Sequence, residues 1–115
     1  MGTKTLKVKD FTETPGPRFE RQGESSGEAF RQKYLAPAFN DAVRNEEVLL
    51  VDLDGTAGYA TSFLEEAFGG LVREFGGELV RKHLQYRCTD EPYLEEEIGL
   101  YISEAATACL SKGAA

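Results

Sequence analysis

The chain has few residues that bind metals or form cross-links: its 115 residues include one histidine, two cysteines, one methionine and no tryptophan. His83, Cys88 and Cys109 lack the spacing of a zinc site, and two cysteines make no disulfide framework. We expect both cysteines to be small buried apolar residues in a reducing compartment, and His83 to lie at the surface or at a sheet edge. The sequence therefore predicts no metal site and no cofactor.

Long apolar segments and an excess of basic residues are also absent. No apolar run approaches the ~20 residues that cross a bilayer, and the first residues lack the apolar core of a signal peptide. The 13 lysines and arginines against 20 aspartates and glutamates give a net charge of -7, without a basic stripe. We expect a cytoplasmic protein that binds neither membrane nor nucleic acid, folded as a single domain over residues 1–115.

The main feature that is present is an apolar strand followed by an amphipathic helix. Residues 48–53, VLLVDL, have too few polar interruptions for a half-exposed strand, so we predict a central strand covered on both faces. Turn residues follow at Asp54-Gly55 and Gly58. Apolar residues then recur with helical spacing and define one face of a helix: Leu64, Ala67, Phe68, Leu71, Val72 and Phe75.

Six further elements surround this unit. Those before it are a half-exposed strand from Leu6 to Phe11, a short strand at 18–21, and a helix that begins at a Ser25/Glu28 capping pattern, bends at Pro37 and ends near Asn45. Those after it are a helical turn at 78–82, a strand at 84–88 and a last helix from Pro92 to Cys109. The order predicts an α/β fold, with a small mixed β-sheet of about four strands and three helices.

The Ser62 hydroxyl at the start of the amphipathic helix is a candidate for phosphorylation. Ser62 and Glu65 have capping-box spacing, in which the hydroxyl bonds the N3 amide and the carboxylate bonds the cap amide. Ser62 is then either only a cap, worth ~1 kcal/mol, or an exposed switch at a helix end that favours negative charge.

The polar side of this helix contains two glycines, Gly69 and Gly70, each costing ~1 kcal/mol in a helix relative to alanine. We predict that a partner protein docks closely there, with a basic patch facing Glu65 and Glu66. The alternative is contact with the protein's own loop or last helix. The predicted partner-binding residues are Gly58, Tyr59, Phe63, Glu65, Glu66, Gly69, Gly70 and Arg73.

Three arginines, Arg18, Arg21 and Arg31, surround the start of the first helix. Free amides at a helix start and nearby guanidinium groups together favour a phosphate or carboxylate. These residues are therefore a candidate anion site, and solvated surface arginines are the alternative.

Three motifs resemble those of a bacterial family: TPGPRF at residues 14–19, SGEAFR at 26–31 and DLDGTAGYATSFLEEAFGGLVRE at 52–74. Together with the order of elements, they are similar to the STAS-like domain family, a domain of unknown function related to anti-sigma factor antagonists. The resemblance implies a STAS-like fold and a non-enzymatic binding module in bacterial signalling. It also implies a protein partner of the histidine-kinase-type ATPase class, or a regulator.

The resemblance assigns a role to the helix start as well. In anti-sigma factor antagonists, a kinase phosphorylates a serine at this position and the phosphate blocks docking. Ser62 falls on that position, and the resemblance makes Thr61, beside it, the second candidate for phosphorylation. The chain departs from the pattern at Ala60, where the family has an acidic residue, and at Phe63, Glu65 and Glu66, which replace small residues. Two carboxylates in the first turn would repel a phosphate carrying about -1.5 to -2 charges.

A different function is suggested by VDLDGT, which fits the aspartate phosphatase motif of the haloacid dehalogenase family. In that alternative Asp52 attacks phosphorus, Asp54 acts as acid and base, and Mg2+ bridges them to the substrate. Such sites also need a second acidic pair, and Asp90 is the only later aspartate. Otherwise Asp52 and Asp54 are turn-forming and capping carboxylates.

Overall fold

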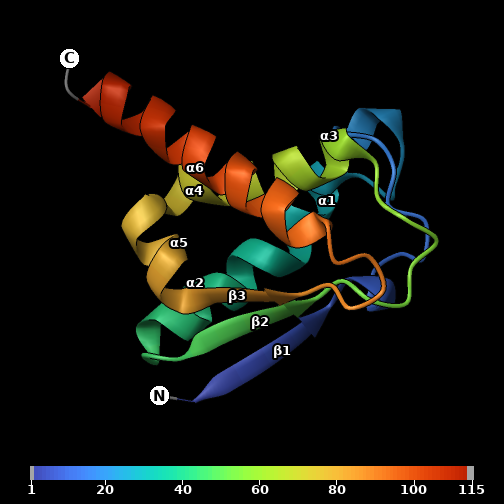
Figure 1. Ribbon diagram of the computed structural model, residues 1–115, viewed down its shortest axis with the longest axis horizontal. Coiled ribbons are helices and arrows are strands. Elements are labelled where there is room, and N and C mark those ends of the chain that lie inside the picture. The colour runs from blue at the N-terminus through green and yellow to red at the C-terminus, as the bar shows by residue number, and fades with distance from the viewer. Residues whose placement is uncertain (1, 114–115) are drawn as a thin grey trace.

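The computed structural model describes residues 2–113 and contains one sheet of three parallel strands (Figure 1). These are β1 (Thr3–Lys7), β2 (Val48–Asp52) and β3 (Leu84–Arg87), in the order β1-β2-β3. The register places Val51 between Leu6 and Tyr86. The prediction that the VLLVDL run forms the central strand is confirmed.

Between and after the strands, the chain forms four continuous helical stretches. It also forms two short 3-10 turns, η1 (Val8–Asp10) and η2 (Glu20–Gln22). The first stretch consists of α1 (Gly27–Phe30), the π-helical turn η3 (Arg31–Leu35) and α2 (Ala36–Arg44). The second, which we call the central helix, consists of α3 (Thr61–Leu64), the π-helical turn η4 (Glu65–Gly69) and α4 (Gly70–Phe75). The others are α5 (Gly77–His83) and α6 (Leu94–Gly113).

The helices pack on one face of the sheet (Figure 1). Along β2, Leu49 and Val51 are buried beneath them, whereas Val48 and Leu50 are only half-buried on the opposite face. The prediction of a strand covered on both faces is therefore wrong for the outer face. An uninterrupted apolar run cannot reveal this difference, because both faces of the strand carry aliphatic side chains.

The observed fold differs from the predicted one in four ways. The first strand begins and ends earlier than Leu6 to Phe11, the sheet is parallel throughout rather than mixed, and a fourth helix, α5, replaces the predicted single turn at 78–82. The predicted strand at 18–21 is absent. The carbonyls of Pro17 and Arg18 instead accept hydrogen bonds from the first amides of α1, so this segment pairs with a helix start rather than with a strand.

The first helical stretch begins one residue later than its capping pattern predicts. Ser26, not Ser25, is the N-cap, and its hydroxyl accepts a hydrogen bond from the Ala29 amide at 3.0 Å. The predicted bend at Pro37 takes the form of the π-helical turn before it, and the stretch continues unbroken to Arg44. A proline has no amide hydrogen to donate, so a local change of helical register costs little there.

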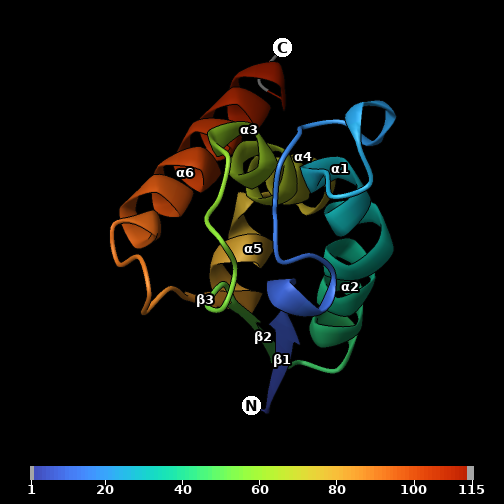
Figure 2. The ribbon, with the colours of Figure 1, turned by 90° about the vertical axis from the view of Figure 1, so that its right-hand side faces the viewer.

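The core is centred on the central helix, which lies between the first helical stretch and α6 (Figure 2). Fully buried aromatic rings from both helical stretches meet there: Phe30, Phe39, Phe63 and Phe68. The apolar face predicted for the central helix is confirmed as buried, except that Phe75 is only partly covered. Within residues 2–113, no helix has the length and apolar composition needed to span a bilayer.

The rare residue types occupy different environments. His83 is 4% exposed and its Nδ1 lies 2.7 Å from the carbonyl oxygen of Glu47, so the prediction of a surface histidine is wrong, although the residue directly precedes the edge strand β3. Cys88 is buried as predicted, and burial raises the pKa of its thiol. Cys109 is only half-buried. Both cysteines are free thiols.

Candidate binding site

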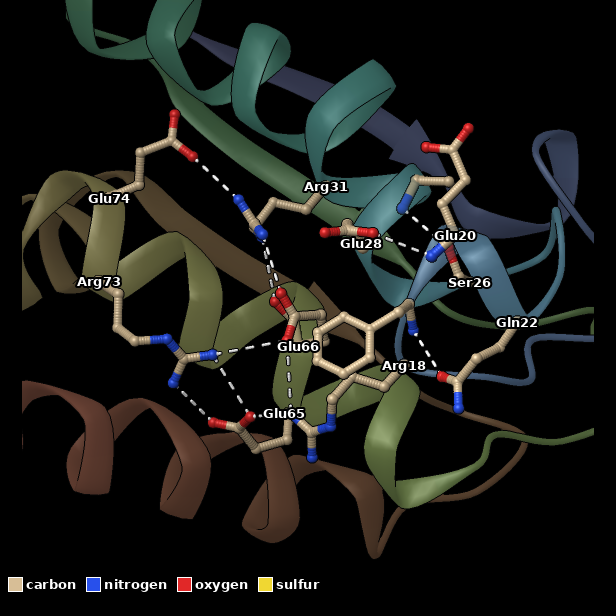
Figure 3. A network of polar contacts seen from close by, with 12 residues as sticks. Arg18, Glu20, Gln22, Ser26, Glu28, Arg31, Glu65, Glu66, Arg73 and Glu74 are labelled. Atoms are coloured by element: carbon tan, nitrogen blue, oxygen red, sulfur yellow. Dashed lines mark hydrogen bonds and ion pairs between the residues drawn. The ribbon is translucent and has the colours of Figure 1, made fainter.

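Six charged side chains from four parts of the chain form a connected set of ion pairs, the arginine–glutamate network (Figure 3). The members are Arg18, Arg31, Glu65, Glu66, Arg73 and Glu74. Arg31 is its centre: Nη2 lies 2.9 Å from Glu66 Oε2, and Nη1 lies 3.2 Å from Glu74 Oε1. Its Nε also donates to the Glu66 carbonyl at 3.2 Å. One guanidinium thus joins the first helical stretch to the central helix by three contacts.

Glu65 is held from two sides. Arg73 donates to its two carboxylate oxygens at 2.9 and 3.3 Å, and Arg18 donates to one of them from the loop before η2. The hydrogen bonds from Arg73 and Arg18 hold the pKa of the Glu65 carboxyl below its usual range, against the opposing effect of burial. The same bond to Glu65 raises the pKa of Arg73.

Two glycines allow the helices to approach closely enough for these contacts. A Cβ on Gly27 would lie 2.4 Å from the carbonyl oxygen of Phe63, and a Cβ on Gly70 would lie 2.4 Å from Arg31 Nε. Sequence reasoning did not identify Gly27. The sequence feature that could have identified it is a glycine in the first turn of a helix, directly after the N-cap serine, because glycine there lowers the stability of the helix.

The predicted docking face is thereby mostly closed. Phe63, Glu66, Gly69 and Gly70 are buried within the protein, and the basic groups that face the glutamates are its own arginines. The expectation of an open outer side is wrong for these residues. The alternative of contact with the protein's own chain holds instead: Arg31 of the first helical stretch lies against Gly70, Arg18 from the loop before η2 pairs with Glu65 and Glu66, and α6 packs against η4.

The start of the central helix remains accessible. Thr61 and Arg73 are exposed, whereas Tyr59, Ser62 and Glu65 are half-buried. A Cβ built on Gly58, which has φ +131°, would meet no atom within 4 Å.

The predicted capping box at Ser62 is absent. Ala60 is the N-cap and makes no side-chain hydrogen bond to the helix. Glu65 does not return to a cap amide because charge-assisted bonds to two arginines are stronger than a bond to a neutral amide.

The three arginines of the candidate anion site have different partners. Arg18 and Arg31 already bind carboxylates of the same chain, and the Arg21 guanidinium lies 5.0 Å from the centre of the Phe19 ring. Arg18 and Arg31 do bind carboxylates, but these carboxylates belong to the central helix of the same chain.

The aspartates of the phosphatase-like motif hold two loops together. Asp52 Oδ1 accepts from the Asp54 amide at 3.0 Å, and Asp54 Oδ1 accepts from the Asp90 amide at 2.9 Å. Asp90 Oδ2 in turn accepts from the Gly55 amide at 2.9 Å. These are the bonds of turn-forming carboxylates. Across residues 2–113, no group of three or more histidines, cysteines, aspartates and glutamates is placed to hold a metal ion.

A parallel three-stranded sheet with helices on one of its faces defines a small α/β module, in which arginines of the same chain pair with the glutamates of the central helix. A protein-family model described as "STAS-like domain of unknown function (DUF4325)" matches residues 26–94, and the protein belongs to this family. The matched residues include the first helical stretch, β2, the central helix, α5 and β3, but not β1. No curated protein and no solved structure matches the chain. A STAS-like fold suggests a signalling or binding module.

Proposed function

We propose that the protein is a non-enzymatic signalling module that binds another protein through the accessible start of the central helix. The surface consists of residues 58–62, which we call the helix-start surface. The observation that supports it best is the exposure of Thr61, with Ser62 half-buried beside it, at a helix end that has no side-chain cap. Such an end presents free amides and a positive dipole to a partner or to a phosphate.

The arginine–glutamate network supports phosphorylation at this surface. The two carboxylates of the first turns, Glu65 and Glu66, are paired with Arg18, Arg31 and Arg73, so their repulsion of a phosphate is largely offset. The departure of this chain from the small residues of anti-sigma factor antagonists therefore does not argue against a phosphoswitch.

The start of the central helix lies beside α6 (Figure 1). Tyr101, on α6, has a pKa that is raised by burial and by the nearby Glu97. A phosphate on Thr61 would place about -1.5 to -2 charges next to this part of α6, which also carries Glu97. Phosphorylation at the helix start would therefore change the electrostatic environment of α6. The partner class that we propose is a histidine-kinase-type ATPase or a regulator that it controls.

Affinity capture tests this proposal. Immobilised wild-type protein and a Thr61→Asp/Ser62→Asp variant are incubated with bacterial lysate, and bound proteins are quantified by mass spectrometry. We expect the charged variant to lose a bound protein by roughly tenfold, while Thr61→Ala/Ser62→Ala and the surface control Glu24→Gln retain it. Equal capture by all four proteins would remove the helix-start surface from consideration.

We assign Asp52 and Asp54 to loop structure rather than to phosphoryl transfer, because both carboxylates accept backbone hydrogen bonds. Incubation of the pure protein with Mg2+ and an aryl phosphate should give no turnover that depends on Asp52. Turnover that the Asp52→Asn substitution abolishes would instead establish phosphatase activity.

A further inference from the structure

The outward face of α6 exposes large apolar side chains. Tyr93, directly before the helix, is 59% exposed and Leu100 is 55% exposed, whereas Leu94, Ile98 and Ile102 are buried against the core. Tyr93 lies one residue before the helix, and Leu100 lies at the end of its second turn. Two of the four large hydrophobic residues that are exposed in the described part of the chain thus mark a line along the first two turns of α6.

Acidic side chains flank this line. Glu95, Glu96 and Glu104 are exposed and Glu97 is half-buried. Among the side chains that the structure describes, none of these four carboxylates lies within ion-pair distance of a basic group. Residues 94–113 contain these four glutamates and one base, Lys112, which gives the helix a net charge of 1 - 4 = -3.

Helix stability alone does not account for this arrangement. Glutamates in a first turn stabilise a helix by ~0.3–1 kcal/mol each through its dipole, which explains Glu95, Glu96 and Glu97. The effect fades beyond the first turn, so it does not apply to Glu104. It also gives no reason for Leu100 to face solvent between Glu96 and Glu104, each four residues away along the same side.

We propose that this α6 face binds a basic amphipathic helix of the partner, in which an apolar side chain is flanked by lysines or arginines. The apolar pair supplies the contact area, and charge complementarity selects a basic partner and excludes acidic ones. This inference rests on the proposed function, because it specifies the chemistry of the partner.

The face is continuous with the helix-start surface. Figure 1 shows α3, which begins at Thr61, beside the first half of α6, the part of that helix that contains Leu100. A single partner can therefore cover both surfaces, and a phosphate on Thr61 would lie at their boundary.

Peptide titration tests the chemistry directly. The probe is a fluorescein-labelled peptide of about 18 residues, with leucines on one helical face and lysines beside them. A second peptide has glutamate in place of each lysine. Fluorescence anisotropy against the full-length protein should show binding of the lysine peptide only. The Glu96→Gln/Glu104→Gln variant should raise its Kd by roughly tenfold, and Leu100→Ser should have a similar effect.

Matched controls separate a specific face from bulk charge. Glu24→Gln/Glu78→Gln makes the same change in net charge elsewhere, and Leu79→Ser removes an exposed leucine from α5. Both should leave the Kd within roughly twofold. Equal weakening by the two double variants, or no binding of the lysine peptide, would overturn the proposal. So would a dimer that Leu100→Ser dissociates, because a second copy would then occupy the face.

The two proposals fail in different ways. If the peptide panel behaves as expected but the Thr61/Ser62 variants capture the same proteins as the wild type, the α6 face stands and the helix-start surface is wrong. If capture depends on Thr61 and Ser62 while the peptides do not discriminate, only the basic-helix partner is wrong.

Discussion

The two glutamate runs of this protein, 65–66 and 95–97, look alike in sequence and occupy opposite environments. Glu66 is 8% exposed and sits between Arg18, Arg31 and Arg73, whereas Glu95 and Glu96 are exposed on α6. The first run links helices through ion pairs, whereas the second is paired with none of the described arginines and exposes its charges to solvent. What separates them is the position of arginines: Arg18 lies 47 residues before Glu65, Arg31 lies 35 residues before Glu66, and Arg73 lies eight residues after Glu65.

The largest effect should come from removing the centre of the network. Arg31→Ala leaves the Glu66 carboxylate without its closest partner in a largely buried position, so we expect a loss of about 3 kcal/mol of unfolding free energy. Urea denaturation measures this loss. Arg21→Ala is the control: because Arg21 lies outside the network, its substitution should lower the unfolding free energy by less than about 1 kcal/mol. Similar losses in both variants would mean that the network contributes no more than a surface arginine.

A smaller loss should follow from separating the two helical stretches. Gly27→Ala places a Cβ against the Phe63 backbone and 3.1 Å from Glu66 Cβ, so the helices must move apart; we expect a loss of about 2 kcal/mol. Gly16→Ala is the control, since its Cβ would meet only an ordinary contact at 3.7 Å. If alanine is tolerated equally at both positions, the close approach at Gly27 does not constrain the fold.

The mildest expected effect is on the dependence of stability on pH. The pKa of Glu65 is lowered in the folded protein, so its contribution is fully present above its ordinary value of 4.5 and is lost as pH falls through the lower folded value. Tm should therefore fall between pH 5 and 3, and Glu65→Gln should reduce that fall. Glu95→Gln, on the exposed run, should leave the pH profile as in the wild type. A profile unchanged by Glu65→Gln would show that Glu65 is not stabilised in its charged form.

Patterns that depend on neighbouring residues predicted the fold well. Spacing alone predicted the VLLVDL strand, the apolar face from Leu64 to Val72, the strand near Leu84 and the last helix. Each of these elements has an apolar run, or one apolar face, that is buried in the core. The STAS-like family was identified from the motifs between residues 14 and 74, and the match over 26–94 confirms it.

Contacts between distant residues were not predictable in the same way. Helical periodicity cannot show that a polar face made of Glu66 and Gly70 is covered, because Arg31 covers it from another helix. The capping box at Ser62 failed for the same reason, since Glu65 is drawn to Arg18 and Arg73. Gly70 was correctly interpreted as a place of close approach, but the group that approaches it, Arg31, belongs to the protein itself, and the atoms nearest to Gly69 belong to Glu65 and Arg73 of the same helix.

The unfolding free energies of Glu66→Gln and Glu96→Gln, measured side by side in urea, test the contrast between the two runs most directly. Both substitutions remove one negative charge and keep the side-chain shape. We predict a loss of about 2 kcal/mol for Glu66→Gln, because two partly buried arginine contacts lose their countercharge. For Glu96→Gln we predict a loss of less than about 1 kcal/mol, the most that a first-turn glutamate contributes through the helix dipole. Equal effects would contradict the assignment of one run to the interior and the other to a partner.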